Sequence, residues 1–173
     1  MFVSVYYFSN IYSRIETVMS NVAAVVELAE IRLIAVEHKG PYHLIGSAFD
    51  RIFTWAHQHG VPIGRGIGIY NDDPREVAPE DLRSLAGMQV PADYQLPESE
   101  PEVRIEVIPA GPYATHTHIG PYEGLPAAWQ TFMAQTLPNG EPLPPGICFE
   151  IYENDPDTTP PDQLITGIYN AAY

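Results

Sequence analysis

Basic residues and cysteine are scarce in this sequence. The 173 residues carry 8 Lys and Arg against 22 Asp and Glu, which gives a formal net charge of −14. Contacts to nucleic acid or to an anionic membrane require clustered Lys and Arg, so neither is an expected partner. The single cysteine, Cys148, excludes an internal disulfide and a multi-cysteine metal site. Such cysteine usage is typical of the reducing cytoplasm, where we expect the protein to act.

Long apolar runs and targeting signals are also absent. No stretch approaches the roughly 18 to 20 residues of a membrane-spanning helix. Residues 1–22 have no basic start and no small-residue cleavage site, so they do not read as an export signal. Met19 offers an alternative start, and we expect residues 1–22 to be an extension outside a single domain at 23–173. Hydrophobic residues make up 45% of the chain, too many for a disordered acidic tail.

Acids without basic partners dominate the second half of the chain. Arg104 is the last basic residue, and eight acids follow it. An acid buried in this half would have no Lys or Arg from its own half, although arginines of the first half could reach it. For any single acid, a solvated surface position is the simplest interpretation. The eight acids are Glu106, Glu123, Glu141, Glu150, Glu153, Asp155, Asp157 and Asp162.

The sequence contains an internal repeat. The segment His38-Lys39-Gly40-Pro41-Tyr42 recurs as His118-Ile119-Gly120-Pro121-Tyr122. Residues 69–74 (I-Y-N-D-D-P) recur as 151–156 (I-Y-E-N-D-P), and residues 79–82 match 161–164. Three blocks in the same order indicate a tandem duplication of residues 24–94 and 102–173, joined by a linker rich in proline and acid.

Each repeat predicts the same elements. Residues 25–37 alternate like a strand but break near Ala29-Glu30, which predicts a bulge or turn there. Apolar residues at three- and four-residue spacing predict helices over 44–56 and 125–137. We therefore expect an α+β fold: a duplicated β-α-β-β module forming one antiparallel sheet, with two long helices on one face and a central cleft on the pseudo-twofold axis. The other expected strands cover 66–70, 82–90, 103–108, 114–119, 147–152 and 164–169.

Glu150 is the acid that the repeat singles out. It lies in the middle of an apolar strand, at the position that Gly68 occupies in the first repeat. Strand alternation places Cys148, Glu150 and Tyr152 on one face. A carboxylate buried there without a partner is costly, so either this face is open to solvent or the acid is there for a ligand.

Aromatic residues in the repeated segments favour the ligand interpretation. Aromatic faces around one carboxylate form a receptor for a lipophilic cation. Trp129 replaces Phe49 of the first repeat and lies on the apolar stripe of its helix, so a core position is the alternative for it. The candidate ligand-binding residues are Glu150, Tyr152, Tyr70, Tyr113, Trp129 and Tyr169.

Other chemistry has little support. His116 and His118 share one strand face, a spacing that can bind metal, but no third ligand is evident, and we expect no metal site. Gly64 to Gly68 lies in a strand without a following helix, so it is not a phosphate-binding loop, and no cofactor is expected. We expect the protein to bind a small lipophilic or cationic molecule, and the sequence leaves a protein partner open.

The paired H-x-G-P-Y segments, each followed by an amphipathic helix, and the repeated I-Y-x-N/D-D-P turn resemble the DNA gyrase inhibitor-like (GyrI-like) small-molecule binding domain over about residues 24–173. This domain also serves as the effector-binding domain of multidrug-sensing regulators of the MerR and AraC families. The resemblance implies two β-α-β-β modules around a ligand cleft, with Glu150 at the position of an acid that faces cationic ligands. Family members often carry an acid where this chain has Gly167.

The resemblance leaves three functions to weigh. A stand-alone binding module for lipophilic cations, of the effector-binding or drug-sequestering type, is the leading one. The first alternative is a hydrolase of strained electrophilic natural products, with Glu150 as general base and Tyr113 orienting the water. The second is an inhibitor of DNA gyrase whose acidic surface resembles DNA. Enzymatic activity is the less favoured interpretation, and no helix-turn-helix segment is present for regulating transcription alone.

Overall fold

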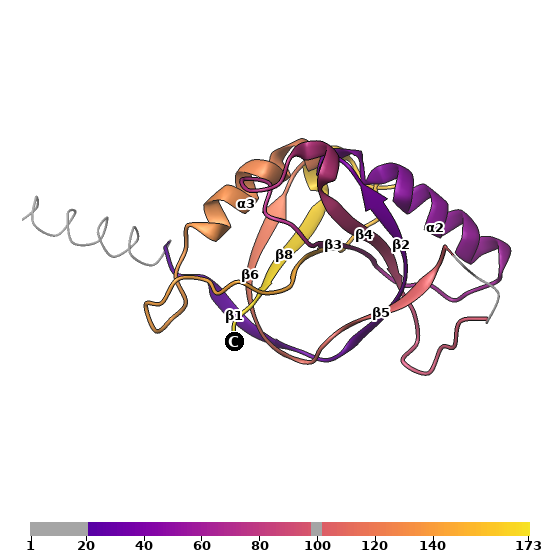
Figure 1. The fold of residues 1–173 in the computed structure, drawn as a ribbon, viewed down its shortest axis with the longest axis horizontal. Helices are drawn as coiled ribbons and strands as arrows, with labels where there is room; N and C mark the ends of the chain where they lie inside the picture. Colours follow the sequence, from indigo (N-terminus) through magenta and orange to yellow (C-terminus); the bar gives the residue numbers. More distant parts are fainter. Residues whose placement is uncertain (1–20, 98–101) are drawn as a thin grey trace, which may run out of the picture.

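The computed structural model describes residues 21–97 and 102–173. Most of the predicted N-terminal extension and part of the linker lie outside these residues. One curled antiparallel sheet of eight strands forms the centre of the protein, and two helices lie on its convex side (Figure 1). The strands run in the order β1-β6-β8-β7-β3-β4-β2-β5. They are β1 (Ala24–Leu28), β2 (Ile31–Lys39), β3 (Gly66–Tyr70), β4 (Arg83–Gln89), β5 (Arg104–Ile108), β6 (Gly111–Ile119), β7 (Cys148–Tyr152) and β8 (Ile165–Ala171).

The two repeats meet in the middle of the sheet. Strands β3 and β7 pair antiparallel, and Gly68 lies directly opposite Glu150 in that register. The α+β architecture predicted from the sequence is confirmed, including the turn between β1 and β2 at residues 29–30. Both faces of β2 pack against apolar residues, which explains why it is buried over several consecutive residues and does not alternate.

The first strand of each repeat pairs with a strand of the other repeat. Strand β1 pairs with β6 of the second repeat, whereas β5 pairs with β2 of the first. Only two residues separate β1 from β2 along the chain. The two strands nevertheless lie near opposite ends of the strand order, because the sheet curls and brings its two ends toward each other, as Figure 1 shows. The two repeats are therefore interlocked within one sheet.

The helices cover one face of the sheet with short apolar stripes. In α2 (Gly46–Gln58) the buried residues Ala48, Ile52 and Ala56 follow a four-residue spacing. Helix α3 (Leu125–Met133) is shorter than predicted and ends four residues before Leu137. Two features end it: Pro138 disfavours helix at Leu137, and Thr136 forms bridges with the distant Val22 and with Pro142. Four 3₁₀ turns complete the fold: η1 (Tyr42–Leu44), η2 (Pro79–Asp81), η3 (Tyr122–Gly124) and η4 (Pro161–Gln163).

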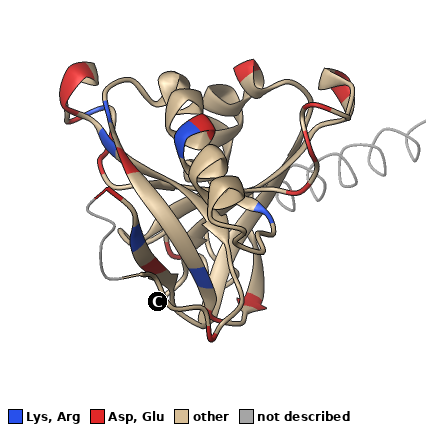
Figure 2. Ribbon diagram, turned by 90° about the vertical axis from the view of Figure 1, so that its right-hand side faces the viewer, with Lys and Arg blue, Asp and Glu red and all other residues tan. Residues whose placement is uncertain are grey.

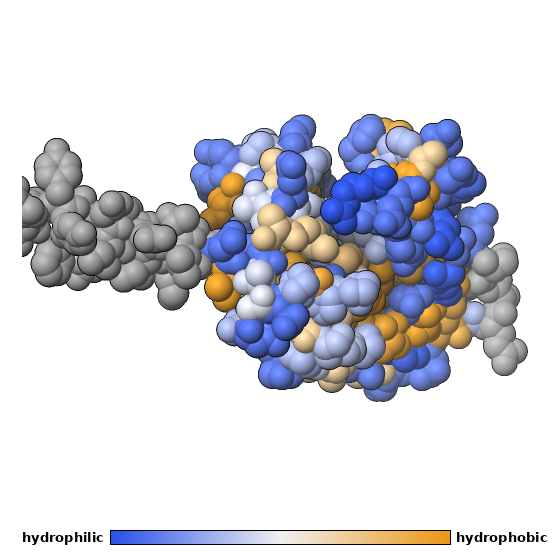
Figure 3. Space-filling model, turned by 60° about the vertical axis from the view of Figure 1, so that its left-hand side comes forward, coloured by the Kyte–Doolittle hydropathy of each residue, from blue (hydrophilic) through white to orange (hydrophobic). Residues whose placement is uncertain are grey.

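Two apolar layers fill the protein on either side of the sheet. The concave side holds Leu33, Ile67, Phe149 and Ile151, and the helix side divides into one cluster under each helix. Hydrophilic residues cover most of the face in Figure 3, with hydrophobic atoms visible between them. Acidic residues concentrate in the turns at the upper corners of Figure 2. No helix within the described ranges is long and apolar enough to cross a membrane.

Candidate functional site

The H-x-G-P-Y segments build two matching corners that bring tyrosines toward the centre of the sheet. In each, the glycine after the strand adopts a positive φ, +126° at Gly40 and +135° at Gly120, a conformation that favours glycine. The histidine ring nitrogen Nε2 then bonds the proline carbonyl, at 3.2 Å for His38 and 3.0 Å for His118. These repeated histidines are therefore parts of a turn.

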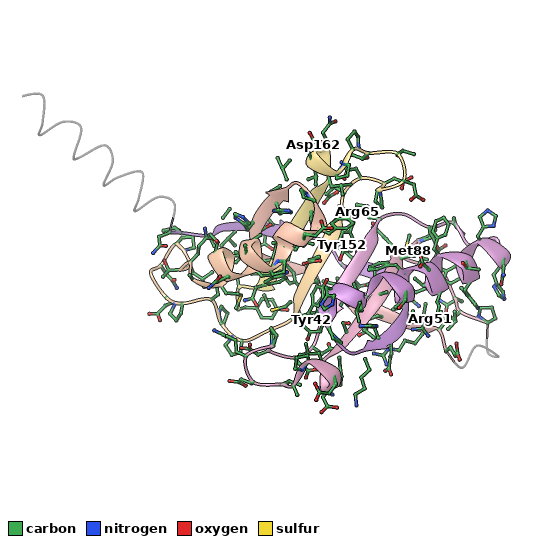
Figure 4. The ribbon with its side chains drawn as sticks, turned by 90° about the horizontal axis from the view of Figure 1, so that it is seen from above. Tyr42, Arg51, Arg65, Met88, Tyr152 and Asp162 are labelled. Atoms are coloured by element: carbon green, nitrogen blue, oxygen red, sulfur yellow. The ribbon has the colours of Figure 1, made fainter. Side chains whose placement is uncertain are left out.

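The tyrosines of these corners support two further tyrosines. The Tyr42 hydroxyl donates to the carbonyl of Asp72 at 2.8 Å and accepts from its backbone N–H at 3.0 Å. The Tyr42 ring then meets the Tyr70 ring edge-on, with centroids 4.8 Å apart. In the second repeat Tyr122 packs against Tyr152 in the same way at 5.4 Å. Figure 4 shows Tyr42 and Tyr152 near the middle of the molecule, between the two helices.

Glu150 lies where the two repeats meet, and only 2% of its surface is exposed to solvent. The hydroxyls of Tyr70 and Tyr152 each donate to Oε2 at 2.7 Å. The indole Nε1 of Trp129 donates to Oε1 at 2.5 Å. A carboxylate has about four acceptor positions, so three are filled and one on Oε1 remains. The predicted place of a cleft is thus occupied by aromatic side chains around a carboxylate.

All three donors to Glu150 are neutral groups. The arginines of the first repeat, which the sequence left as alternative partners, bond elsewhere. Arg65 Nη1 donates to both carboxylate oxygens of Glu153 at 3.1 Å, and Arg83 pairs with Asp72 at 2.7 Å. Arg32 and Arg51 donate to backbone carbonyls. The three hydrogen bonds to the carboxylate therefore bring no positive charge to it, an arrangement that favours an incoming cation.

Gly68 makes room for this arrangement. A Cβ at position 68 would lie 3.0 Å from the Tyr70 hydroxyl oxygen and 3.3 Å from that of Tyr152. Gly68 of the first repeat and Glu150 of the second therefore belong to one site: the glycine leaves the space that the hydroxyls bonded to the acid occupy. The sequence pointed to Gly68 as the counterpart of Glu150, but it gave no signal that the glycine accommodates the hydroxyls.

Burial raises the pKa of both central tyrosines well above the ordinary value. For Tyr70 the negative charge of Glu150 adds to this rise. Both hydroxyls therefore stay protonated, and remain hydrogen-bond donors, even at a pH where an exposed tyrosine ionises. Aromatic rings cross between the repeats: Phe49 meets Tyr152 at 5.3 Å, and Trp129 meets Tyr70 at 6.1 Å. Sequence reasoning missed Phe49 as part of the site, whereas Tyr42 and Tyr122 belong to the repeated segments whose aromatic residues favoured a ligand.

Four of the six candidate ligand-binding residues come together: Glu150, Tyr152, Tyr70 and Trp129. Tyr113 and Tyr169 lie on the concave face, where both pack against Phe149. The Tyr113 hydroxyl donates to the carbonyl of Pro109 at 2.8 Å, so it does not serve Glu150. Gly167 is on that concave face as well, covered by the Tyr169 ring, and an acid there would not join Glu150.

Two buried hydroxyls flank the site symmetrically. Ser84 pairs with Tyr70 across β4 and β3, and Thr166 pairs with Tyr152 across β8 and β7. Within the described part of the chain, neither hydroxyl has a hydrogen-bond partner. No group of three potential metal ligands occurs among those residues either, and His116 stacks on Phe132 with its pKa lowered by burial.

A two-repeat α+β sheet with a ring-lined carboxylate on its pseudo-twofold axis defines a small-molecule binding domain. Residues 24–170 match the model of the GyrI-like small molecule binding domain, and the chain belongs to this family. A DNA gyrase inhibitor of Erwinia billingiae is 32% identical over 136 residues, covering 76% of this chain and 85% of that protein.

Solved structures agree on the fold. The C-terminal domain of EcmrR has a TM-score of 0.65 at 20% identity, covering 86% of this chain and 94% of that one. EcmrR in a DNA complex has a TM-score of 0.73 at 19% identity. That alignment covers 95% of this chain but 62% of the EcmrR chain, so this chain spans less than two thirds of its length.

Proposed function

We propose that this domain binds small lipophilic cations and that Glu150 is the anionic group that selects them. The observation that carries the proposal is the buried carboxylate whose hydrogen-bond donors are all neutral. A cation that reaches Glu150 supplies the missing positive charge in a site of low dielectric, where charge pairing is strong. The rings of Tyr70, Tyr152 and Phe49 supply apolar area and cation–π attraction.

The test is the affinity of a lipophilic cation for the Glu150→Gln variant. Rhodamine 6G binding, followed by fluorescence polarisation, should weaken by about 1 to 3 kcal/mol, or about 5- to 150-fold in Kd, the worth of a charge-assisted contact. Glutamine keeps the volume of the side chain and removes its charge, although one acceptor oxygen becomes an NH2 donor.

Glu123→Gln is the matched control because Glu123 is exposed and its replacement changes the net charge equally. It should leave the affinity unchanged. Equal affinities in all three proteins would contradict the proposal. Urea unfolding of each variant shows that the comparison is made on folded protein.

A further inference from the structure

Trp129 differs from the other two donors in how firmly it is held. Tyr70 and Tyr152 lie on β3 and β7, which are paired on both sides, and their rings are packed by Tyr42, Tyr122 and Phe49. Trp129 is partly exposed and lies on a helix of nine residues without a side-chain cap. Because Glu150 is 2% exposed, a ligand must displace a covering group to reach it. Trp129 is the donor that can leave with the least disruption of the sheet.

The repeat supports a specific link between Trp129 and Glu150. The first repeat has Phe49 in place of Trp129 and Gly68 in place of Glu150. The donor and the acceptor therefore occur together in one repeat and are both missing from the other. Phe49 also shows that a phenylalanine fits this position of the helix.

From these contacts we propose that Trp129 is an internal ligand of Glu150, that an external ligand replaces its N–H on Oε1, and that the site therefore selects flat aromatic cations bearing an N–H donor. This inference rests on the proposed function. When the indole leaves, Oε1 loses its donor, and a cation with its own N–H restores that bond while a cation without a donor does not. The vacated space is that of an indole between the rings of Tyr70 and Phe132, at 6.1 and 5.9 Å from the Trp129 ring, which fits a flat bicyclic ring.

The first experiment follows the indole N–H signals of Trp55 and Trp129 by 15N NMR. In the free protein, the signal that disappears in Trp129→Phe should lie downfield because its proton is bonded to a carboxylate. Saturation with 4-aminoquinoline, which is protonated at neutral pH, should move it to the position of an indole bonded to water. A Trp129 signal that keeps its downfield position at saturation would overturn the proposal, since the indole would then be a permanent wall of the site.

The second experiment measures affinities by calorimetry. Trp129→Phe should bind 4-aminoquinoline more tightly, by about tenfold or more, because the competing hydrogen bond from the indole to the carboxylate is removed. Trp55→Phe is the control and should not differ from the parent protein. 1-Methylquinolinium, a flat cation of similar size without an N–H, should bind about tenfold or more weakly than 4-aminoquinoline. Weaker binding by Trp129→Phe, or equal binding of the two probes, would refute the inference.

The two proposals fail in different ways. If rhodamine 6G binds through Glu150 while the Trp129 signal stays in place, the inference on Trp129 is wrong and the proposed function stands. If neither quinoline nor rhodamine 6G binds the parent protein, the proposed function is wrong as well. Urea midpoints of all variants identify any loss of affinity that comes from unfolding.

Discussion

At the scale of single residues, the central tyrosines and Glu150 depend on one another. A buried carboxylate without donors costs several kcal/mol, and each tyrosine hydroxyl offsets part of that cost. In return, burial and the nearby negative charge keep Tyr70 protonated, with its pKa raised. The two hydroxyl oxygens also lie 3.2 Å apart, so a shift in the position of one hydroxyl changes the hydrogen bonding of the other.

This mutual dependence predicts a loss of stability in alkaline solution. The folded-state pKa values of Tyr70 and Tyr152 lie above that of an unfolded tyrosine, which is about 10. The folded protein therefore keeps protons that the unfolded chain releases, and the stability that this difference supplies is complete below pH 10 and lost as the pH rises further.

Absorbance of tyrosinate at 295 nm and circular dichroism, followed together, check this prediction. A group of tyrosines, including Tyr70, Tyr113 and Tyr152, should ionise only as the far-UV signal is lost. Ionisation of all 11 tyrosines near pH 10 with the folded signal intact would contradict it.

At the scale of elements, strand β3 needs a residue without a side chain opposite Glu150. The Gly68→Ala variant places a methyl group 3.0 Å from the Tyr70 hydroxyl oxygen, in a strand that is held on both sides and cannot shift. We expect a loss of about 1 to 2 kcal/mol in the free energy of unfolding, as for other overpacked core sites. Rhodamine 6G affinity should fall too, because both hydroxyls move.

The matched control for Gly68 is Gly66→Ala in the same strand. A Cβ at position 66 meets Phe49 and Tyr152 at 3.4 Å, close to ordinary contact. Urea unfolding should therefore show a clearly smaller change than for Gly68→Ala. Equal effects of the two substitutions would mean that the methyl group acts on the strand in general and not on the tyrosines.

Strand and helix positions were largely predictable from the sequence because the repeat gave each element twice. Alternation placed Cys148, Glu150 and Tyr152 on one face, which the structure confirms. It could not place Tyr113 and Tyr169 relative to Glu150, since alternation in one strand does not say which face of the next strand it shares. Only the pairing register decides that. The shortened α3 escaped prediction because its end depends on a bridge between Thr136 and the distant Val22.

At the scale of the whole molecule, the exchanged first strands make the repeats inseparable. The sequence predicts only a bulge or turn between β1 and β2, but β1 pairs with β6, while β2 pairs with β4 and β5. Such long-range pairing is not encoded in local pattern. Residues 21–97 alone would expose the edge of β3 and leave both β1 and β2 short of a partner.

We therefore predict that fragments 21–97 and 102–173 do not fold as separate monomers. Each should lack cooperative urea unfolding by circular dichroism, and mixing them should restore it together with rhodamine 6G binding. A fragment that is monomeric by size exclusion and unfolds cooperatively would contradict the prediction. An equimolar mixture with a scrambled partner fragment serves as the control.

The pairing of β3 with β7 sets a single negative charge at the centre of the molecule because the two repeats differ there. Two identical copies of the second repeat, joined in the same register, would set two carboxylates directly opposite each other across the central strands, and like charges in that position repel. Two copies of the first repeat would set two glycines there and leave no charge at all. Joining two non-identical repeats in one chain breaks the symmetry at that single pair. A lone anion on a twofold axis, which no symmetric dimer of either repeat can have, becomes available for a monovalent ligand.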